Sequence, residues 1–195
     1  LAVISAIMKY HATTRMRESI NDAMDVHSGK AVIDGPLNYL QPHYRAIPIG
    51  ITVEGANIVT RNLIIFGQGA IRAHPHLLDE MQALQEPDRE KSLTDFDKHF
   101  WKHVGHSTRT FFRAWWSGWT GRGSVPDNAG DIAPLYARLS RWSAAFAVTA
   151  DMAFLTLGGE LKRKEMISAR LGDALSEMFL VSAALKRWED DGRHA

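Results

Sequence analysis

Apolar side chains recur every three or four residues along most of this chain, which is the spacing of one face of an α-helix. In the first segment, from Leu1 to Val26, they fall at Val3, Ile7, Met8, Met16, Ile20 and Met24. This pattern predicts a helix that ends near Ser28-Gly29. The pattern elsewhere gives helices and little else, so the predicted fold class is all-α: a helical bundle followed by a second helical domain.

The stretch 31–50 interrupts this periodicity with Gly35-Pro36, Pro42 and Pro48. It is predicted to be a loop with one short turn at 37–45. A second long helix is predicted from Gly55 to about Leu84. Gly67 and Gly69 weaken it by roughly 1 kcal/mol each relative to Ala, so another helix or a ligand is expected to approach there. Pro75 is expected to kink or end this helix.

The polar segment Gln85–Lys91 contains Pro87 and is typical of a linker, so the predicted domains are 1–84 and 93–195, with a linker at 85–92. The second domain is predicted to hold three helices, two of them an antiparallel pair. Their predicted ranges are Leu93–Trp116, Ile132–Leu157 and Leu161–Asp190.

Composition narrows the function classes. The 195 residues are 45% hydrophobic, enough for a real core, and the net charge of +1 gives no field to attract nucleic acid. The absence of cysteine excludes disulfides and suits a reducing cytoplasm. Charges interrupt every apolar window, so no membrane span is predicted. Because the chain begins at Leu1 inside a helical pattern, it is expected to be part of a longer protein.

The segment Thr52–Arg61 places one carboxylate, Glu54, after an apolar approach and directly before Gly55. The preceding Ile47–Ile51 offers no cation, so desolvation is expected to raise the pKa of Glu54 toward a range useful for proton transfer near neutral pH. Gly55 leaves open backbone for a ligand. The alternative interpretation is an acid in the first turn of a helix, stabilised by the helix dipole.

The sequence Val-Glu-Gly-Ala-Asn followed by Ile-Val-Thr-Arg, at 53–61, resembles the catalytic-base segment of the acyl-CoA dehydrogenases. Met24–Ala31 resembles the family's glycine-rich turn after a long helix. The segments Asn62–Pro75 and Leu161–Trp188 resemble one branch, the long bacterial enzymes of fatty-acid β-oxidation, which carry an additional C-terminal helical domain. The resemblance covers nearly all of the chain.

The resemblance implies α,β-dehydrogenation of a fatty acyl-CoA, medium to long in chain length, with FAD as hydride acceptor. It implies that Glu54 is the base that removes the α-proton and that Gly55 lies against the thioester. Ala56 and Asn57 would lie near the flavin. Ser28 and Gly29 would reach the cofactor of a neighbouring subunit, which implies a homo-oligomer.

Further implied features are an electron-transfer flavoprotein as electron acceptor, a cytoplasmic location and a peripheral contact with the inner membrane. The family's N-terminal helical domain and β-domain have no counterpart here, so the isolated chain is expected to be inactive. Two alternatives stay open: an acyl-CoA oxidase, and a non-catalytic helical module for oligomerisation or membrane docking.

Two other groups of residues invite a functional interpretation. His99, His103 and His106 have the helical spacing that can bring imidazoles to one metal ion, but no carboxylate or cysteine accompanies them in that turn, so no metal is assigned. His74 and His76 are expected at the surface of a helix end. The tryptophans of the second domain are expected to pack between helices, the alternative being an interfacial or acyl-binding surface; they are Trp115, Trp116 and Trp119.

Overall fold

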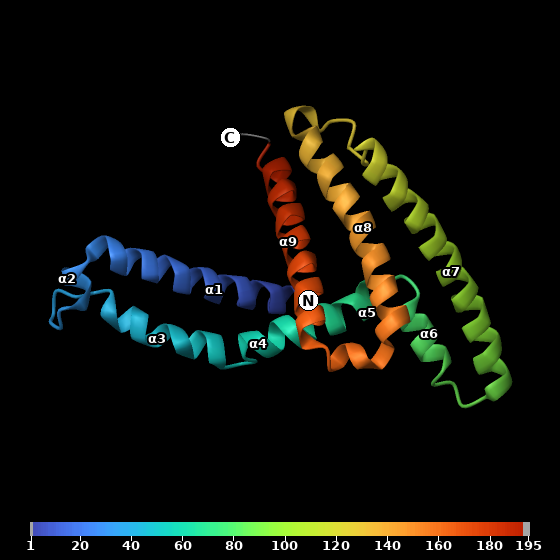
Figure 1. Cartoon of the computed structure of the whole chain (residues 1–195), viewed down its shortest axis with the longest axis horizontal. Helices are drawn as coiled ribbons and strands as arrows, with labels where there is room; N and C mark the ends of the chain where they lie inside the picture. The colour runs from blue at the N-terminus through green and yellow to red at the C-terminus, as the bar shows by residue number, and fades with distance from the viewer. Residues whose placement is uncertain (1, 193–195) are drawn as a thin grey trace.

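The computed structural model describes residues 2–192, and it confirms the all-α class, because no strand occurs in that range. Helices α1 (Ala2–His27) and α3 (Gln41–Thr52) lie side by side and form an extended arm. Helices α7 (Arg89–Thr120), α8 (Ala133–Leu157) and α9 (Glu165–Asp190) stand at the other side of the molecule (Figure 1).

The structure of the arm confirms the first predicted helix and corrects the loop predicted for residues 31–50. Helix α1 ends at His27, next to the predicted Ser28-Gly29. The short helix α2 (Gly29–Val32) follows, and only 33–40 is loop. The predicted loop at 41–50 is wrong: α3 begins with Pro42 in its first turn, where a missing N–H costs little, and buries Ile47. Packing against α1 offsets the cost of Pro48 inside this helix.

The predicted helix from Gly55 to Leu84 is divided in the structure. A short α4 (Asn57–Val59) leads into η1, a π-helix over Thr60–Gln68, and then into α5 (Gly69–Ala73). The chain turns at Pro75, as predicted for this residue, and α6 (Leu77–Ala83) is a separate helix. A π-helix is rare and frequently lies at functional sites.

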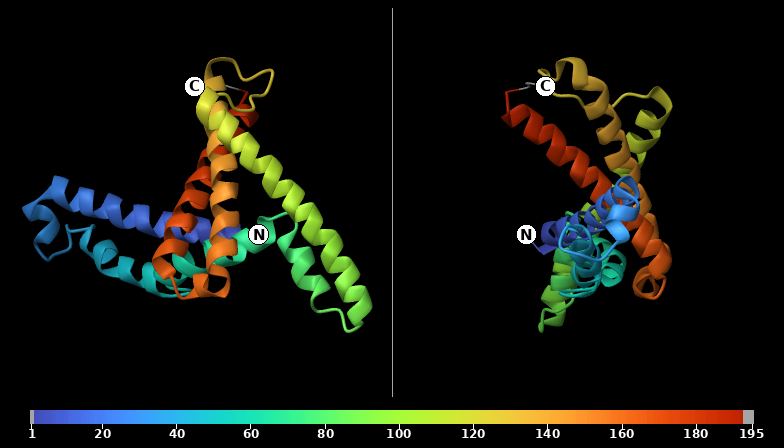
Figure 2. Two further views of the ribbon diagram at one scale, coloured as in Figure 1. Left: turned by 45° about the vertical axis from the view of Figure 1, so that its right-hand side comes forward. Right: turned by 90° about the vertical axis from the view of Figure 1, so that its left-hand side faces the viewer.

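The hydrophobic core joins residues from both sides of the predicted linker. Phe66 and Ala70 pack with four buried residues of the later helices: Ala150, Ala153, Leu161 and Leu171. Phe66 stacks on Phe154 with ring centroids 5.6 Å apart. Helix α9 therefore returns across η1, as the views in Figure 2 show.

Glycines allow the close approach of these helices. A Cβ on Gly172 of α9 would lie 2.8 Å from the Arg61 carbonyl oxygen, and one on Gly69 would lie 3.0 Å from Val3. The expected close contact is therefore confirmed at Gly69. It is wrong at Gly67, where a Cβ would meet nothing within 4 Å.

The three helices predicted after the linker are confirmed. Asp88 caps α7 by accepting a hydrogen bond from the Glu90 N–H at 3.0 Å, so α7 begins four residues before the predicted start. Gly121, at φ 71°, ends α7 in the left-handed region. Two 3₁₀ turns, η2 (Gly130–Ile132) and η3 (Gly158–Lys162), flank α8.

The continuous helical stretch Gly130–Lys162 is long and apolar enough to cross a membrane by length and composition alone. The pair Gln41–Thr52 and Asn57–Ala73 passes that test only together, with a bend of 45°. A mostly buried core helix of a soluble protein passes the same test; here 22% of the apolar window is buried, and α8 packs along α7. The absence of a membrane span stays a prediction.

The structure corrects two expectations about side chains. Trp115, Trp116 and Trp119 do not pack between helices: they are 57%, 54% and 76% exposed on α7. His74 is not a surface residue, because its side chain is only 10% exposed. Tertiary contacts determine the burial of these side chains. The turn at Pro75 places His74 against α7 and α8, whereas no helix among the described residues covers the three tryptophans.

Candidate functional site

The predicted base lies on a short turn between α3 and α4. Glu54 has φ 53° and Gly55 has φ 90°, so two consecutive residues are in the left-handed half of backbone space. This conformation costs a residue with a side chain about 1–2 kcal/mol. Helix α4 begins only at Asn57, so the interpretation of Glu54 as a first-turn helix acid is wrong.

Lys9 of α1 holds this turn in place. Its ammonium donates hydrogen bonds to the Gly55 carbonyl oxygen at 2.8 Å, to Asn57 Oδ1 at 2.7 Å and to the Ile51 carbonyl oxygen at 3.3 Å. An ammonium has three donors, and here all three are used. The local sequence offers no cation, but the fold brings one to the residues on either side of Glu54.

Two further side chains fix the same turn. Asn57 is buried and donates from Nδ2 to Thr13 Oγ1 at 2.8 Å, while Thr60 Oγ1 donates to the Gly55 carbonyl oxygen at 3.2 Å. The polar atoms of the Asn57 side chain are thus engaged within the chain.

The carboxylate itself is exposed, and so is Gly55. Apart from Thr60 Oγ1, which would lie 3.5 Å from a Cβ on Gly55, nothing crowds this glycine. The described residues therefore present Glu54 beside open backbone without burying it. The desolvation expected from the sequence has to come from whatever covers the turn.

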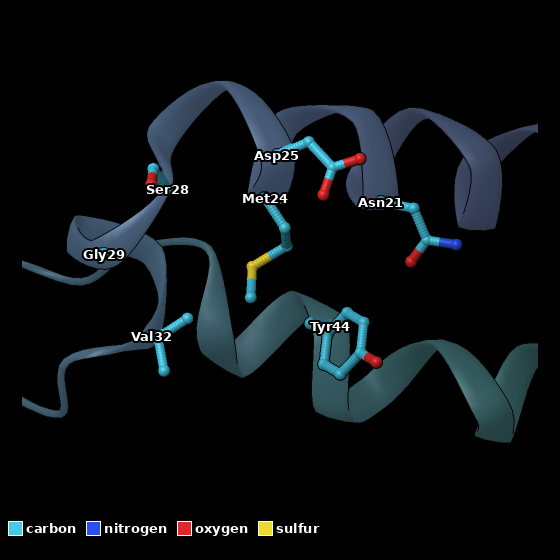
Figure 3. Close-up of a pocket in the computed structure, with 7 residues that line it drawn as sticks. All are labelled: Asn21, Met24, Asp25, Ser28, Gly29, Val32 and Tyr44. Atoms are coloured by element: carbon cyan, nitrogen blue, oxygen red, sulfur yellow. The ribbon is translucent and has the colours of Figure 1, made fainter.

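Ser28 and Gly29 lie at the far end of the arm from Glu54. Helix α3 separates the two positions, and its 12 residues span roughly 18 Å. Ser28 and Gly29 line an open hollow of about 720 Å³, into which Met24, Val32 and Tyr44 also point (Figure 3). The fold thus divides the predicted residues into one group on the 54–57 turn and another at the tip of the arm.

Helix α9 supports the site from the other side of η1. The Arg61 guanidinium donates to Asp173 through Nε at 2.7 Å and through Nη2 at 2.5 Å, a bidentate pair. This hydrogen bonding raises the pKa of Arg61 above its ordinary value. Asn62 donates to Glu165 Oε2 at 3.1 Å, so α9 holds η1 at two positions.

Sequence reasoning missed Lys9, Thr13 and Asp173. No local signal marks them, because they lie 45, 41 and 119 positions from Glu54 by chain number. Only the pairing of α1 with α3, and of α9 with η1, makes them neighbours of the turn or of its supporting helix.

These features define an all-α protein that presents one carboxylate beside open glycine backbone, on a turn clamped by a lysine. The model of the family described as acyl-CoA dehydrogenase, C-terminal, bacterial type, matches residues 71–195. The chain belongs to this family, which confirms the resemblance noted from the sequence. No solved structure matches the chain.

Proposed function

We propose that this chain is the C-terminal part of a flavin-dependent acyl-CoA dehydrogenase that acts on medium- to long-chain fatty acyl-CoA in β-oxidation. The observation that carries the proposal is the left-handed, clamped turn that presents Glu54 beside Gly55. The family match begins at residue 71, after this turn, so the role of Glu54 rests on the resemblance and on the geometry.

The chemistry assigned to Glu54 is proton removal. Once the thioester carbonyl is polarised, the α-C–H bond breaks, the proton passes to the Glu54 carboxylate and the electron pair forms the α,β double bond. Flavin adenine dinucleotide, when bound, accepts the hydride from the β-carbon. The proposal requires substrate and further polypeptide to cover Glu54, since its carboxylate is exposed in this structure.

Some residues of the turn that carries Glu54 leave room for a flat ligand. Gly55 leaves its backbone open and Ala56 adds only a methyl group, which supports an approach of thioester and flavin at these two residues. The hydrogen bonds of Asn57 to Lys9 and Thr13 support a structural role for that side chain. Because no strand lies within 2–192, we propose that the β-domain implied by the family belongs to preceding polypeptide.

A homo-oligomer is part of the proposal. The arm consists of two helices and a loop, and it leaves large apolar side chains in solvent: Val26 at 82%, Leu37 at 80% and Ile33 at 70% exposed. These exposed side chains, close together in the sequence at the tip of the arm, support an interaction site there. A second copy that covers the tip of the arm would bring Ser28 and Gly29 to a neighbouring cofactor.

An electron-transfer flavoprotein is proposed as electron acceptor and the cytoplasm, at the inner membrane, as location. The support for a peripheral membrane contact is the exposed tryptophan surface of α7, since tryptophan combines an apolar body with a polar tip. Quenching of tryptophan fluorescence by vesicles, compared between wild type and Trp119→Ala, tests this contact.

The experiment that tests the catalytic assignment is anaerobic titration of the longer protein with a long-chain acyl-CoA, followed by flavin absorbance. Wild type is expected to bleach, and Glu54→Gln, which keeps the size and removes the base, is expected not to. Glu18→Gln on the exposed surface of α1 is the control and should bleach like wild type.

Each other outcome identifies an alternative. A protein without flavin, or equal bleaching in wild type and Glu54→Gln, would favour a non-catalytic helical module. Bleaching that oxygen reverses rapidly, with slow transfer to an electron-transfer flavoprotein, would identify an acyl-CoA oxidase.

A further inference from the structure

A cluster of polar side chains lies between the helices of the C-terminal part, outside the Glu54 turn. His74 comes from the turn between α5 and α6, His103 from α7 and Asp151 from α8. One ligand atom from each lies within 4.8 Å of the other two. The three side chains are 10%, 20% and 17% exposed, so they meet inside the structure.

The hydrogen bonding of His103 directs one ring nitrogen into the cluster. His103 Nδ1 lies 2.8 Å from Glu80 Oε1 and donates its proton to that carboxylate. The neutral ring then has its lone pair on Nε2, which faces Asp151 Oδ1 at 3.9 Å. Two electron-pair donors thus face each other across a gap too long for a hydrogen bond, and a cation between them would satisfy both.

Asp151 is oriented in a corresponding way. Its Oδ2 accepts a hydrogen bond from Ser107 Oγ at 2.6 Å, which leaves Oδ1 directed at the two histidines. Carboxylate on histidine and hydroxyl on carboxylate are the outer contacts that orient metal ligands in proteins. Glu80 and Ser107 supply both of them here.

His74 provides the third atom. Its Nε2 is buried and lacks a hydrogen-bond partner, although it lies 3.2 Å from Asp151 Oδ1, because the alignment is not that of a hydrogen bond. This unpartnered nitrogen, on a side chain nine-tenths buried, points at the same oxygen as His103 Nε2. Because His74 Nδ1 accepts from two backbone N–H groups, Nε2 carries the ring proton in the metal-free chain and faces Asp151 Oδ1. A metal ion would take the place of that proton and would also engage His103 Nε2.

We propose that His74 Nε2, His103 Nε2 and Asp151 Oδ1 form a binding site for a divalent metal ion of the zinc class. Two imidazoles and one carboxylate are ligands that Zn²⁺ favours, with water in the fourth position. Ligands about 2.0–2.1 Å from a tetrahedral zinc lie roughly 3.3 Å apart. The observed separations of 3.2 and 3.9 Å are close to this value.

Metal binding has a consequence for the His74 turn. The backbone N–H groups of His76 and Leu77 point at His74 Nδ1 from 3.2 and 3.1 Å. A metal on Nε2 places the ring proton on Nδ1, so these two N–H groups have to move away. The ion would therefore join α7 and α8 to the α5–α6 turn and change the backbone there.

Isothermal titration of the metal-free 195-residue chain with Zn²⁺, and cobalt substitution followed by visible absorbance, test the site. One ion per chain is expected, with a four-coordinate cobalt spectrum. His103→Ala and Asp151→Asn should weaken binding at least 100-fold. His99→Ala is the matched control, because His99 is on the same helix, lies 3.4 Å from Asp79 and is outside the group of His74, His103 and Asp151, and it should change affinity less than threefold.

Two measurements keep the test valid if those variants misfold. Ser107→Ala should weaken binding about tenfold, as the loss of an outer contact does. The amide NMR signals of His76 and Leu77 should shift on addition of Zn²⁺. No stoichiometric binding, loss of binding in His99→Ala, or unshifted amides at His76 and Leu77 would each overturn the proposal.

Discussion

The ammonium of Lys9 lies 2.8 Å from the carbonyl oxygen of Gly55, 46 positions later in the chain. This contact connects the first turns of α1 to the turn that carries Glu54. Because the same ammonium also bonds Asn57 Oδ1 and the Ile51 carbonyl oxygen, one side chain fixes both ends of the turn.

Lys9→Met is expected to destabilise the chain by about 1–3 kcal/mol, because Asn57 Oδ1 then lies in a largely buried place without its donor. Methionine retains most of the apolar stem. Urea unfolding measures the loss. Lys30→Met, at an exposed position of α2, is the control and should change stability by less than about 0.5 kcal/mol. Equal effects of the two substitutions would disprove the clamp.

Gly172→Ala is expected to destabilise by about 1–3 kcal/mol, since its Cβ would lie 2.8 Å from the backbone of Arg61 and η1 or α9 has to shift. Gly105→Ala, in the middle of α7 with nothing within 4 Å of the added Cβ, should instead stabilise by up to about 1 kcal/mol. Thermal unfolding of both variants is the measurement. Opposite signs support the close packing of α9 on η1, whereas equal stabilisation would exclude it.

Arg61 and Asp173 are expected to couple by about 1 kcal/mol in a double-mutant cycle of Arg61→Ala and Asp173→Ala. The pair is bidentate, but both side chains are about a third exposed, which limits the energy. The coupling should fall in 1 M salt compared with low salt, because exposed charges are screened. A coupling near zero at low salt would contradict a supporting role of this pair.

Stability is expected to fall at high pH because of Tyr10. Burial raises the pKa of the Tyr10 phenol; the Arg61 guanidinium lowers it, and the carboxylates of Asp173 and Glu177 add to the increase. A folded pKa above the unfolded value of about 10 gives stability that is complete below pH 10 and is lost as the pH rises through the folded pKa.

Urea unfolding between about pH 8 and pH 11 checks this, and Tyr10→Phe should show a shallower loss than wild type. Tyr39→Phe, which removes an exposed phenol bonded to His27, is the control and should lose stability with the same pH slope as wild type. Identical pH profiles for Tyr10→Phe and wild type would show that burial of the phenol does not contribute.

The helices were largely predictable because their burial patterns are local. The C-terminal end of α1 and the positions of α7, α8 and α9 follow from periodicity and from glycines near the helix ends. The caps Asp88 and Gly121 were not recognised, so α7 is four residues longer at each end than predicted. Periodicity failed at α3, where Pro42 and Pro48 resemble loop residues, and at η1, because nine residues are too few to distinguish a π-helix from an α-helix by their apolar spacing. The exposure of the α7 tryptophans could not be predicted either. A sequence pattern shows that a helix has an apolar face, but it does not show what that face contacts.

The sequence by itself determined the all-α class, because helical spacing is local, and its resemblance to the acyl-CoA dehydrogenases indicated the family and proposed Glu54 as the base. The tertiary structure alone decided that Lys9 clamps the Glu54 turn, that Ser28 and Gly29 lie at the other end of the arm, and that His103 meets His74 and Asp151. Each of these depends on which helices pack together. Contacts between residues tens of positions apart leave no local signal in the chain.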